Sequence, residues 1–304
     1  MGRTALFSRH QPGGVFTVDD LGEHPGDIYF VDSGSTTTGA DSVGYGRNPD
    51  APFLTLDYAV GQCTASQGDT IYCMPGHAET VSAAGGLDLD VIGITVIGLG
   101  AGALQPTVTL DTVDTADVDI DAANITVENI HFIAGVADIA AAIDVNACSF
   151  TLRNCRMTGD NGGLNALIWV QDAPANGSDR IIIEDCYCMD VDASNTHFVN
   201  FAGTGYGHIV RDNILYGDFG TICIGGAGVV THCTVMNNVI YNESATNDSC
   251  INFDATATGI VTGNYAAGGA AQANGFTATA MVLAENYYGV LAEDLSAILD
   301  PIAT

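Results

Sequence analysis

Basic residues are almost missing from this chain of 304 residues, which has no lysine and seven arginines against 36 acidic residues. Its formal net charge of -29 at pH 7 repels the phosphates of nucleic acids and of anionic membranes. We therefore expect neither a nucleic acid nor a membrane among the partners. An acidic surface of this kind suits cations, a salty medium or a basic protein partner.

Long apolar runs are missing as well. No stretch approaches the roughly 18 uninterrupted apolar residues of a membrane span, and the opening residues MGRTALFSRHQPGG lack the apolar core of a signal peptide. We therefore expect synthesis in a reducing cytoplasm. Under those conditions most of the nine cysteines are expected to remain unpaired.

What the chain does contain is one seven-residue motif in seven copies. The copies are TVENIHF (126–132), TLRNCRM (151–157), IIEDCYC (182–188), IVRDNIL (209–215), TVMNNVI (234–240), IVTGNYA (260–266) and VLAENYY (282–288). Two upstream segments, GDTIYC and GITVIG, extend the series back through Ile71 and Val96, and the second positions recur every 22 to 31 residues. This period predicts a solenoid, and the β-branched, Gly and Asn content predicts that its units are strands.

A bend is expected inside each motif. The second and seventh residues are mostly apolar, yet residues five apart lie on opposite faces of a straight strand. The positions between them are rich in residues that tolerate left-handed backbone, namely Asn129, Asn154, Asp185, Asp212, Asn237 and Gly263. A short strand with an in-out-in pattern, such as Ile143-Asp144-Val145, precedes most motifs. Three strands per unit predict an all-β fold, a right-handed parallel β-helix (solenoid) of about nine coils.

The third motif position supplies a test of this register. It reads Glu128, Arg153, Glu184 and Arg211 in successive copies, so opposite charges should lie side by side in adjacent coils. Each such pair contributes only about 0.2–1 kcal/mol, but the alternation favours one register.

The ends of the chain depart from the repeat. Residues 1–27 are expected to form an N-terminal arm, residues 28–290 the β-helix with its cap, and residues 291–304 a C-terminal closing segment. A short capping helix is predicted near 54–65, LTLDYAVGQCTA, because an open end of a β-helix exposes unpaired backbone groups.

The segment FVDSGSTTTGADSVGYGRNPDAPFLTLDYAVGQC, followed by GDTIYCMPGHAETV, resembles the start of parallel β-helix proteins of the pectate-lyase-like superfamily. It is most similar to versions that tailed bacteriophages encode among their virion genes. The resemblance covers residues 29–81 in motif detail and the other coils in architecture. It implies a virion protein, made in the host cytoplasm without a signal peptide, with capsid or tail proteins as partners. Fold alone does not give function.

Catalysis has one candidate site. Lyases of this superfamily pair calcium-binding acids with a proton-abstracting base, whereas this chain has no lysine, and Arg153 and Arg211 already belong to the charge alternation. A hydrolase needs two carboxylates about 5–9 Å apart, and Asp185 and Asp212 share one position in successive coils. We favour a structural role for both, because neighbouring coils have Asn at this position.

A sugar site is a second candidate. Trp169, the lone tryptophan, is expected to point outward between Asp144 and Asn200, a combination suited to a host glycan. Burial of the indole beneath its own loop is the favoured alternative.

A calcium site is a third candidate. The strand DVDID places Asp117, Asp119 and Asp121 on one face, although a solvated acidic face is the favoured reading. No other cofactor is expected.

Two further features point to assembly. The sixth motif position turns apolar toward the C-terminus and predicts a homotrimer interface made of Tyr187, Ile214, Val239, Tyr265 and Tyr287. The arm carries basic and apolar side chains that we expect to attach the rod to its particle, namely Arg3, Phe7, Arg9 and Phe16.

We therefore favour a non-enzymatic virion structural protein, a capsid decoration or surface protein attached by its arm. The alternatives are a tailspike-like glycan hydrolase that uses the Asp pair, and a carbohydrate-binding adhesin.

Overall fold

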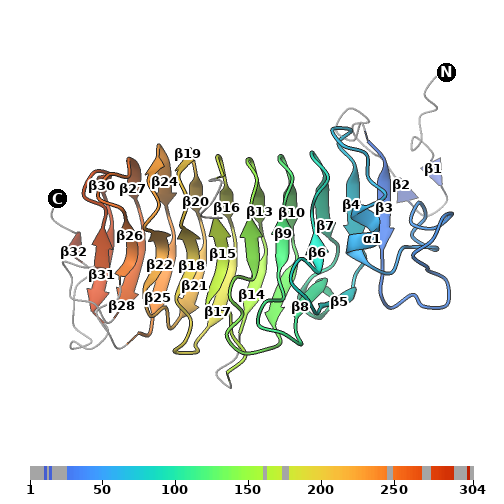
Figure 1. Cartoon of the computed structure of the whole chain (residues 1–304), viewed down its shortest axis with the longest axis horizontal. Helices are drawn as coiled ribbons and strands as arrows, with labels where there is room; N and C mark the ends of the chain where they lie inside the picture. Colours follow the sequence, from blue (N-terminus) through green and yellow to red (C-terminus); the bar gives the residue numbers. More distant parts are fainter. Residues whose placement is uncertain are drawn as a thin grey trace.

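The computed structural model describes residues 10–11, 14–15, 26–159, 163–172, 178–244, 249–268, 275–290 and 300–301. These residues form an all-β rod in which the chain winds through three parallel sheets in about 8 turns (Figure 1). The predicted right-handed parallel β-helix is confirmed.

Each sheet takes one strand from most coils. The first sheet contains, in spatial order, β3 (Ile28–Val31), β4 (Thr70–Cys73), β7 (Thr95–Gly98), β10 (Thr126–Glu128), β13 (Thr151–Arg153), β16 (Ile182–Glu184), β20 (Ile209–Arg211), β24 (Cys233–Met236), β27 (Gly259–Thr262) and β30 (Val282–Ala284). The second contains β5 (Ala78–Val81), β8 (Thr107–Leu110), β11 (His131–Ala134), β14 (Arg156–Thr158), β17 (Tyr187–Asp190), β21 (Ile214–Gly217), β25 (Val239–Asn242), β28 (Tyr265–Gly268), β31 (Tyr287–Val290) and β32 (Asp300–Pro301). The third contains β6 (Leu87–Asp88), β9 (Val118–Ile120), β12 (Ile143–Val145), β15 (Ile168–Asp172), β18 (His197–Phe201), β22 (Ile222–Gly226), β26 (Ser249–Phe253) and β29 (Phe276–Thr277).

The predicted register is confirmed along the whole first sheet. The second motif positions pair in one continuous column: Ile71, Val96, Val127, Leu152, Ile183, Val210, Val235, Val261 and Leu283. The third sheet has eight strands, so the rod has about 8 turns where nine were expected. The difference arises because α1, rather than a complete set of strands, closes the N-terminal end.

The bends are also where the sequence predicts them. The fourth motif position has positive φ in all seven copies, from Asn129 at 57° to Glu285 at 53°. Left-handed backbone at this position turns the chain from the first sheet into the second, and Asn, Asp and Gly tolerate it best. A second set of left-handed residues, which the sequence analysis missed, includes Asn124, Ser149, Arg180 and His232 just before first-sheet strands.

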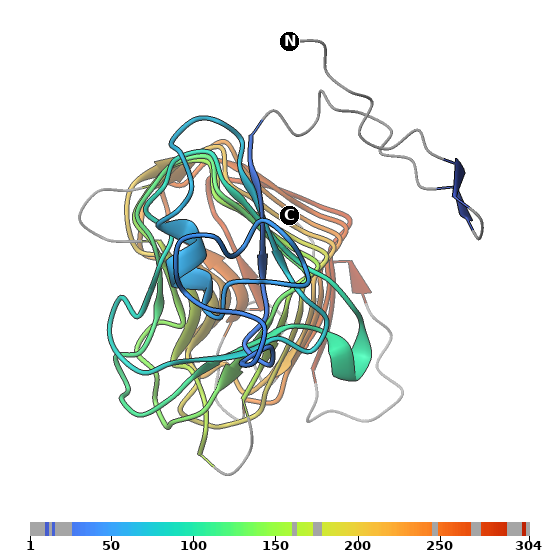
Figure 2. The same ribbon diagram turned by 90° about the vertical axis from the view of Figure 1, so that its right-hand side faces the viewer.

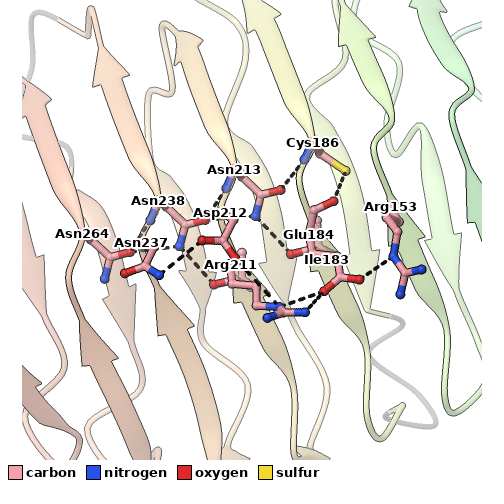
Figure 3. A network of polar contacts seen from close by, with 11 residues as sticks. Arg153, Ile183, Glu184, Cys186, Arg211, Asp212, Asn213, Asn237, Asn238 and Asn264 are labelled. Atoms are coloured by element: carbon pink, nitrogen blue, oxygen red, sulfur yellow. Dashed lines mark hydrogen bonds and ion pairs between the residues drawn. The ribbon is translucent and has the colours of Figure 1, made fainter.

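Directly after these bends, buried asparagines connect the C-terminal coils (Figure 3). The Asn238 side-chain oxygen accepts hydrogen bonds from the backbone nitrogen and the side-chain amide of Asn213, at 3.1 and 2.9 Å. In the same way, the side-chain oxygen of Asn264 accepts two hydrogen bonds from Asn238, and that of Asn286 accepts two from Asn264. Each amide therefore satisfies polar groups of the next coil inside the core.

The column of opposite charges lies on the outer surface of the same sheet (Figure 3). Nε of Arg153 is 2.5 Å from Oε1 of Glu184, and Nε of Arg211 is 2.8 Å from Oε2 of the same glutamate. The two guanidinium groups cover Glu184, which is 3% exposed, and their hydrogen bonds hold its pKa below the usual value despite burial. The predicted alternation is confirmed.

The N-terminal cap contains helix α1 (Leu56–Val60), which lies within the predicted segment 54–65. Figure 2 looks along the rod from this end and shows α1 over its cross-section. Thr55 is the N-cap and accepts from the backbone nitrogen of Tyr58, while Leu56, Ala59 and Val60 are buried. No described helix is long and apolar enough to cross a membrane.

His77, from the PGHAET segment, joins the cap to the first coils. Its Nδ1 accepts from the backbone nitrogen of Ser33 at 3.0 Å, and its Nε2 lies 3.2 Å from Oε2 of Glu79. Glu79 also accepts from the backbone nitrogen of Leu56 at the start of α1. Buried His77 is therefore a structural residue with both ring nitrogens in contact.

Both chain ends lie largely outside the described residues. Strands β1 (His10–Gln11) and β2 (Gly14–Val15) pair antiparallel in a two-stranded sheet of their own. At the other end, β32 pairs antiparallel with β31. A further two-stranded sheet, β19 (Gly205–Tyr206) with β23 (Val230–Thr231), lies between third- and first-sheet strands in the chain.

The cysteines are thiols, as expected. All nine are free, and seven are buried. Burial raises the pKa of Cys155 and of Cys250 to about 12, so these side chains are packed, unreactive core groups.

The amide column yields a first prediction. Asn238→Ala removes the acceptor of two Asn213 donors and the donors to Val210 and Asn264, all buried. Each unsatisfied buried group costs about 1–3 kcal/mol, so we expect the free energy of unfolding to fall by about 3–5 kcal/mol in urea titrations. Asn237→Gly is the matched control, because Gly263 occupies the equivalent bend of the next coil. Equal stability of the two variants would contradict a stabilising role for the column.

Candidate functional site

The candidate catalytic pair, Asp185 and Asp212, lies on exposed bends of successive coils. Oδ1 of Asp212 accepts from the Asn237 amide at 3.2 Å, and its other oxygen is 4.0 Å from Nε of Arg211. Asp185, but not Asp212, lines the groove that opens at this corner of the rod. The two carboxylates share a column of turn residues, and their use in catalysis stays a prediction.

The outward position considered for Trp169 is wrong, and the burial of the indole, which the sequence analysis favoured, is confirmed. Across the third sheet Asp144 pairs with Gln171, which in turn pairs with Asn200, so Gln171 is the outward neighbour of both. Trp169 is 0% exposed, and its Nε1 donates to Oδ2 of Asp190 at 3.0 Å. The in-out-in reading failed because β15 has two consecutive buried residues, Trp169 and Val170, which break the alternation.

The acids of the DVDID strand have different partners in the structure. Oδ1 of Asp117 accepts from the backbone nitrogen of Gly85, and Oδ1 of Asp121 accepts from the Asn146 amide at 2.9 Å. Asp119 instead pairs in register with acids of both neighbouring coils, Asp88 and Asp144.

We call Asp88, Asp119 and Asp144 the aspartate row. The sequence analysis missed it because it considered acids along one strand rather than across strands. The signal was present as the repeated pattern Leu87-Asp88-Leu89, Val118-Asp119-Ile120 and Ile143-Asp144-Val145. Among the described residues, no group of three or more His, Cys, Asp or Glu side chains is arranged to hold a metal ion. Calcium binding by the predicted set, Asp117, Asp119 and Asp121, therefore stays a prediction.

The aspartate row is electrostatically unfavourable. Desolvation is the first cause that raises the pKa of Asp119 and of Asp144 to about 6, and it also raises the pKa of Asp88. Repulsion from Asp117 and Asp121 adds to it for Asp119 and Asp144, and repulsion from Asp121 adds to it for Asp88. One buried carboxylate oxygen each of Asp88 and Asp144 has no hydrogen-bond partner in the described part of the chain.

The predicted interface residues form one surface. Tyr187, Ile214, Val239, Tyr265 and Tyr287 are in register on consecutive strands of the second sheet. Met189, Tyr216 and Tyr241 lie beside them, two residues further along their strands. We call these eight residues the apolar face. Ile214, Val239 and Tyr265 are 52%, 47% and 49% exposed.

The tyrosine rings of the apolar face are stacked on one another. Tyr265 and Tyr287 have ring centroids 5.1 Å apart at an interplanar angle of 10°, and Tyr216 and Tyr241 are 5.2 Å apart at 28°. Each ring of a stacked pair covers one face of the other. The eight residues are in register on adjacent strands and form a continuous apolar surface, which is suited to a protein contact.

The predicted attachment residues Arg3, Phe7, Arg9 and Phe16 lie outside the described residues. The described part of the arm, β1 and β2, pairs with no strand of the three long sheets.

Comparison with known proteins agrees with the architecture. No protein-family model and no curated protein sequence matches the chain. Among solved structures, a rhamnogalacturonan lyase aligns with a TM-score of 0.50 over 80% of this chain and 74% of its own, at 13% identity. A GH136 lacto-N-biosidase from Eubacterium ramulus aligns at 0.38 and 11% identity, over 87% of this chain and 68% of its own.

The similarity to the rhamnogalacturonan lyase supports the architecture alone. The chain has a parallel β-helix fold, which the resemblance of residues 29–81 implied. Identities of this size carry no information about the reaction or ligand.

The aspartate row yields a second prediction, with a defined pH dependence. The pKa of Asp119 is about 6 in the folded protein, and that of an aspartate in an unfolded chain is about 3.9. Its contribution to stability is therefore fully present below about pH 3.9 and is lost as the pH rises through about 6. Asp119→Asn removes this loss. We expect equal stability of variant and wild type at pH 4, and a gain of about 1 kcal/mol for the variant at pH 8, since the side chain is only partly buried.

Thermal unfolding at both pH values measures this difference, with the exposed Asp50→Asn as the control. A variant less stable than wild type at pH 8 in metal-free buffer would contradict the repulsion. Calcium that raises the melting temperature of wild type, but not of Asp119→Asn, would establish the predicted calcium site.

Proposed function

We propose that this protein is a non-enzymatic structural protein of a bacteriophage virion: a rigid rod that decorates the capsid, attached through its N-terminal arm. The apolar face is the observation that carries the structural role. It covers consecutive coils of a strongly acidic chain, and none of its eight residues is charged. Such a surface is costly to leave in water and is characteristic of protein contacts. The viral setting rests on the resemblance of residues 29–81.

The arrangement of carboxylates favours a role without catalysis. A hydrolase holds two carboxyl groups around one bound sugar, whereas Asp185 alone lines the corner groove. The alternative, an Asp-pair glycan hydrolase, shares its fold with a carbohydrate-active enzyme, the rhamnogalacturonan lyase. A shared fold is weak support, because many functions use it.

We further propose that the apolar face joins three copies of the chain into a homotrimer. Parallel rods related by a three-fold axis form a closed ring of identical contacts, which buries the face of every copy. Each copy carries a net charge of -29, so the apolar contact has to overcome repulsion between the copies. Salt screens that repulsion.

The third prediction tests the trimer. Wild-type protein at micromolar concentration should have the mass of a trimer by light scattering, and its dissociation constant should fall as NaCl increases from 50 to 500 mM. Ile214→Glu places an acid in the apolar face and should yield monomers with an unchanged melting curve. Thr109→Glu, on the same sheet nearer the N-terminus, should remain trimeric. A monomeric wild type would refute self-association, and an association weakened by salt would favour a basic partner.

The fourth prediction tests the arm. A chain that starts at Asp27 lacks the arm but keeps all three long sheets, so it should retain its β-sheet circular dichroism and cooperative melting. It should not bind particles that lack this protein, whereas the full chain should. Particle binding by the shortened chain would defeat the attachment role, and loss of cooperative melting would assign the arm to the cap instead.

A further inference from the structure

A groove of about 530 Å³ opens along the corner between the first and second sheets, on the N-terminal side of the apolar face. Its volume lies in the range of small-molecule sites, about 300–1,000 Å³. The bend residues Asn129, Asn154 and Asp185 of three successive coils line it, together with Arg156 and Tyr187 on the second sheet.

One wall of the groove is held in place by hydrogen bonds. Asn129 donates to the carbonyl oxygens of Gly98 at 2.7 Å and of Gly100 at 3.0 Å, and accepts from the Gln105 amide at 3.2 Å. These bonds fix the loop that carries the short 3-10 helix Gly102–Leu104 against the bend. The groove is therefore formed before any ligand arrives, which lowers the cost of binding.

The two charged side chains of the groove, Arg156 and Asp185, form no ion pair within the described residues. Arg47, Arg153 and Arg211 form ion pairs, whereas Arg156 has no ion-pair or hydrogen-bond partner for its guanidinium among the described residues. It lies over the ring of Tyr187, 5.7 Å from the centroid.

The carboxylate of Asp185, in the same groove, also lacks a hydrogen-bond or ion-pair partner in the described part of the chain. The chain has only seven basic residues against 36 acids, yet Arg156 and Asp185 line one groove without pairing with each other. They leave a hydrogen-bond donor and an acceptor for a ligand. The Asn154 amide, whose nitrogen is a weak 3.5 Å from Oδ1 of Asn129, adds an acceptor and a donor.

We propose that this groove binds a neutral oligosaccharide. Adjacent sugar hydroxyls donate to a carboxylate and accept from a guanidinium or an amide, which matches Asp185, Arg156 and Asn154. An anionic sugar would meet the Asp185 carboxylate and the field of a chain with a net charge of -29. An apolar side chain of a peptide would find no apolar pocket, because the groove is lined mainly by polar groups.

This site differs from the sugar site that the sequence predicted. That site involved Asp144, Trp169 and Asn200 on the third sheet, whereas the groove lies between the other two sheets. It also adds a binding activity to the proposed structural role, and it needs no chemical step, since Asp185 is its single carboxylate.

The test is an array of neutral, sialylated and uronate-containing oligosaccharides, probed with the full chain, followed by calorimetric titration of a retained neutral oligosaccharide. Asp185→Asn and Arg156→Gln should each weaken binding at least tenfold. The bend at Asp185 accepts Asn, since Asn129 and Asn154 occupy it in neighbouring coils, so the variant should fold normally.

Two controls match these variants. Asp212→Asn makes the same change at the next bend, outside the groove. Arg180→Gln removes another arginine that forms no ion pair among the described residues and lies at a different bend, just before β16. Both should bind as wild type does. Retention of only anionic oligosaccharides, retention of none, or binding that Asp185→Asn and Arg156→Gln leave unchanged would overturn the proposal.

Discussion

The hydrogen bonds that lock each bend to the bend of the next coil are the constraint on which the rest of the structure depends. In the C-terminal half the column Asn213, Asn238, Asn264 and Asn286 satisfies buried backbone and amide groups from coil to coil. A register slip would leave these groups unpaired in the core, at about 1–3 kcal/mol each. Successive coils are therefore superposed residue on residue, and every outward position becomes a column along the rod.

The columns explain both the favourable and the unfavourable features of the surface. Where charges alternate, as in Arg153, Glu184 and Arg211, stacking creates ion pairs and covers a glutamate. Where acids are crowded, as around Asp88, Asp119 and Asp144, desolvation and then repulsion from nearby aspartates, including Asp121, raise the carboxyl pKa values. The fold tolerates the aspartate row because the remaining columns and the continuous apolar interior hold the register.

The apolar face and the corner groove divide one side of the rod between two kinds of contact. Tyrosines of adjacent coils stack on the apolar face, and its continuous apolar surface suits a protein contact. The groove has the opposite character, because a fixed loop and unpaired polar groups leave hydrogen-bonding capacity for a hydroxylated ligand. If both proposals hold, the rod combines assembly along one surface with recognition at another.

The sequence by itself determined the period, the bends, the first-sheet register and the column of opposite charges. It did so because each of these is a repeated local choice: a left-handed residue, a buried β-branched residue or a charge recurs at a fixed motif position. The tertiary structure alone decided the place of Trp169, since two consecutive buried residues in β15 shift the alternation and bring the indole to Asp190. It also decided that Asp119 lies in register with Asp88 and Asp144, and that a loop closes over Asn129 to form a groove. These contacts join residues about one coil apart, so they depend on the register of coils of unequal length, which no single segment specifies.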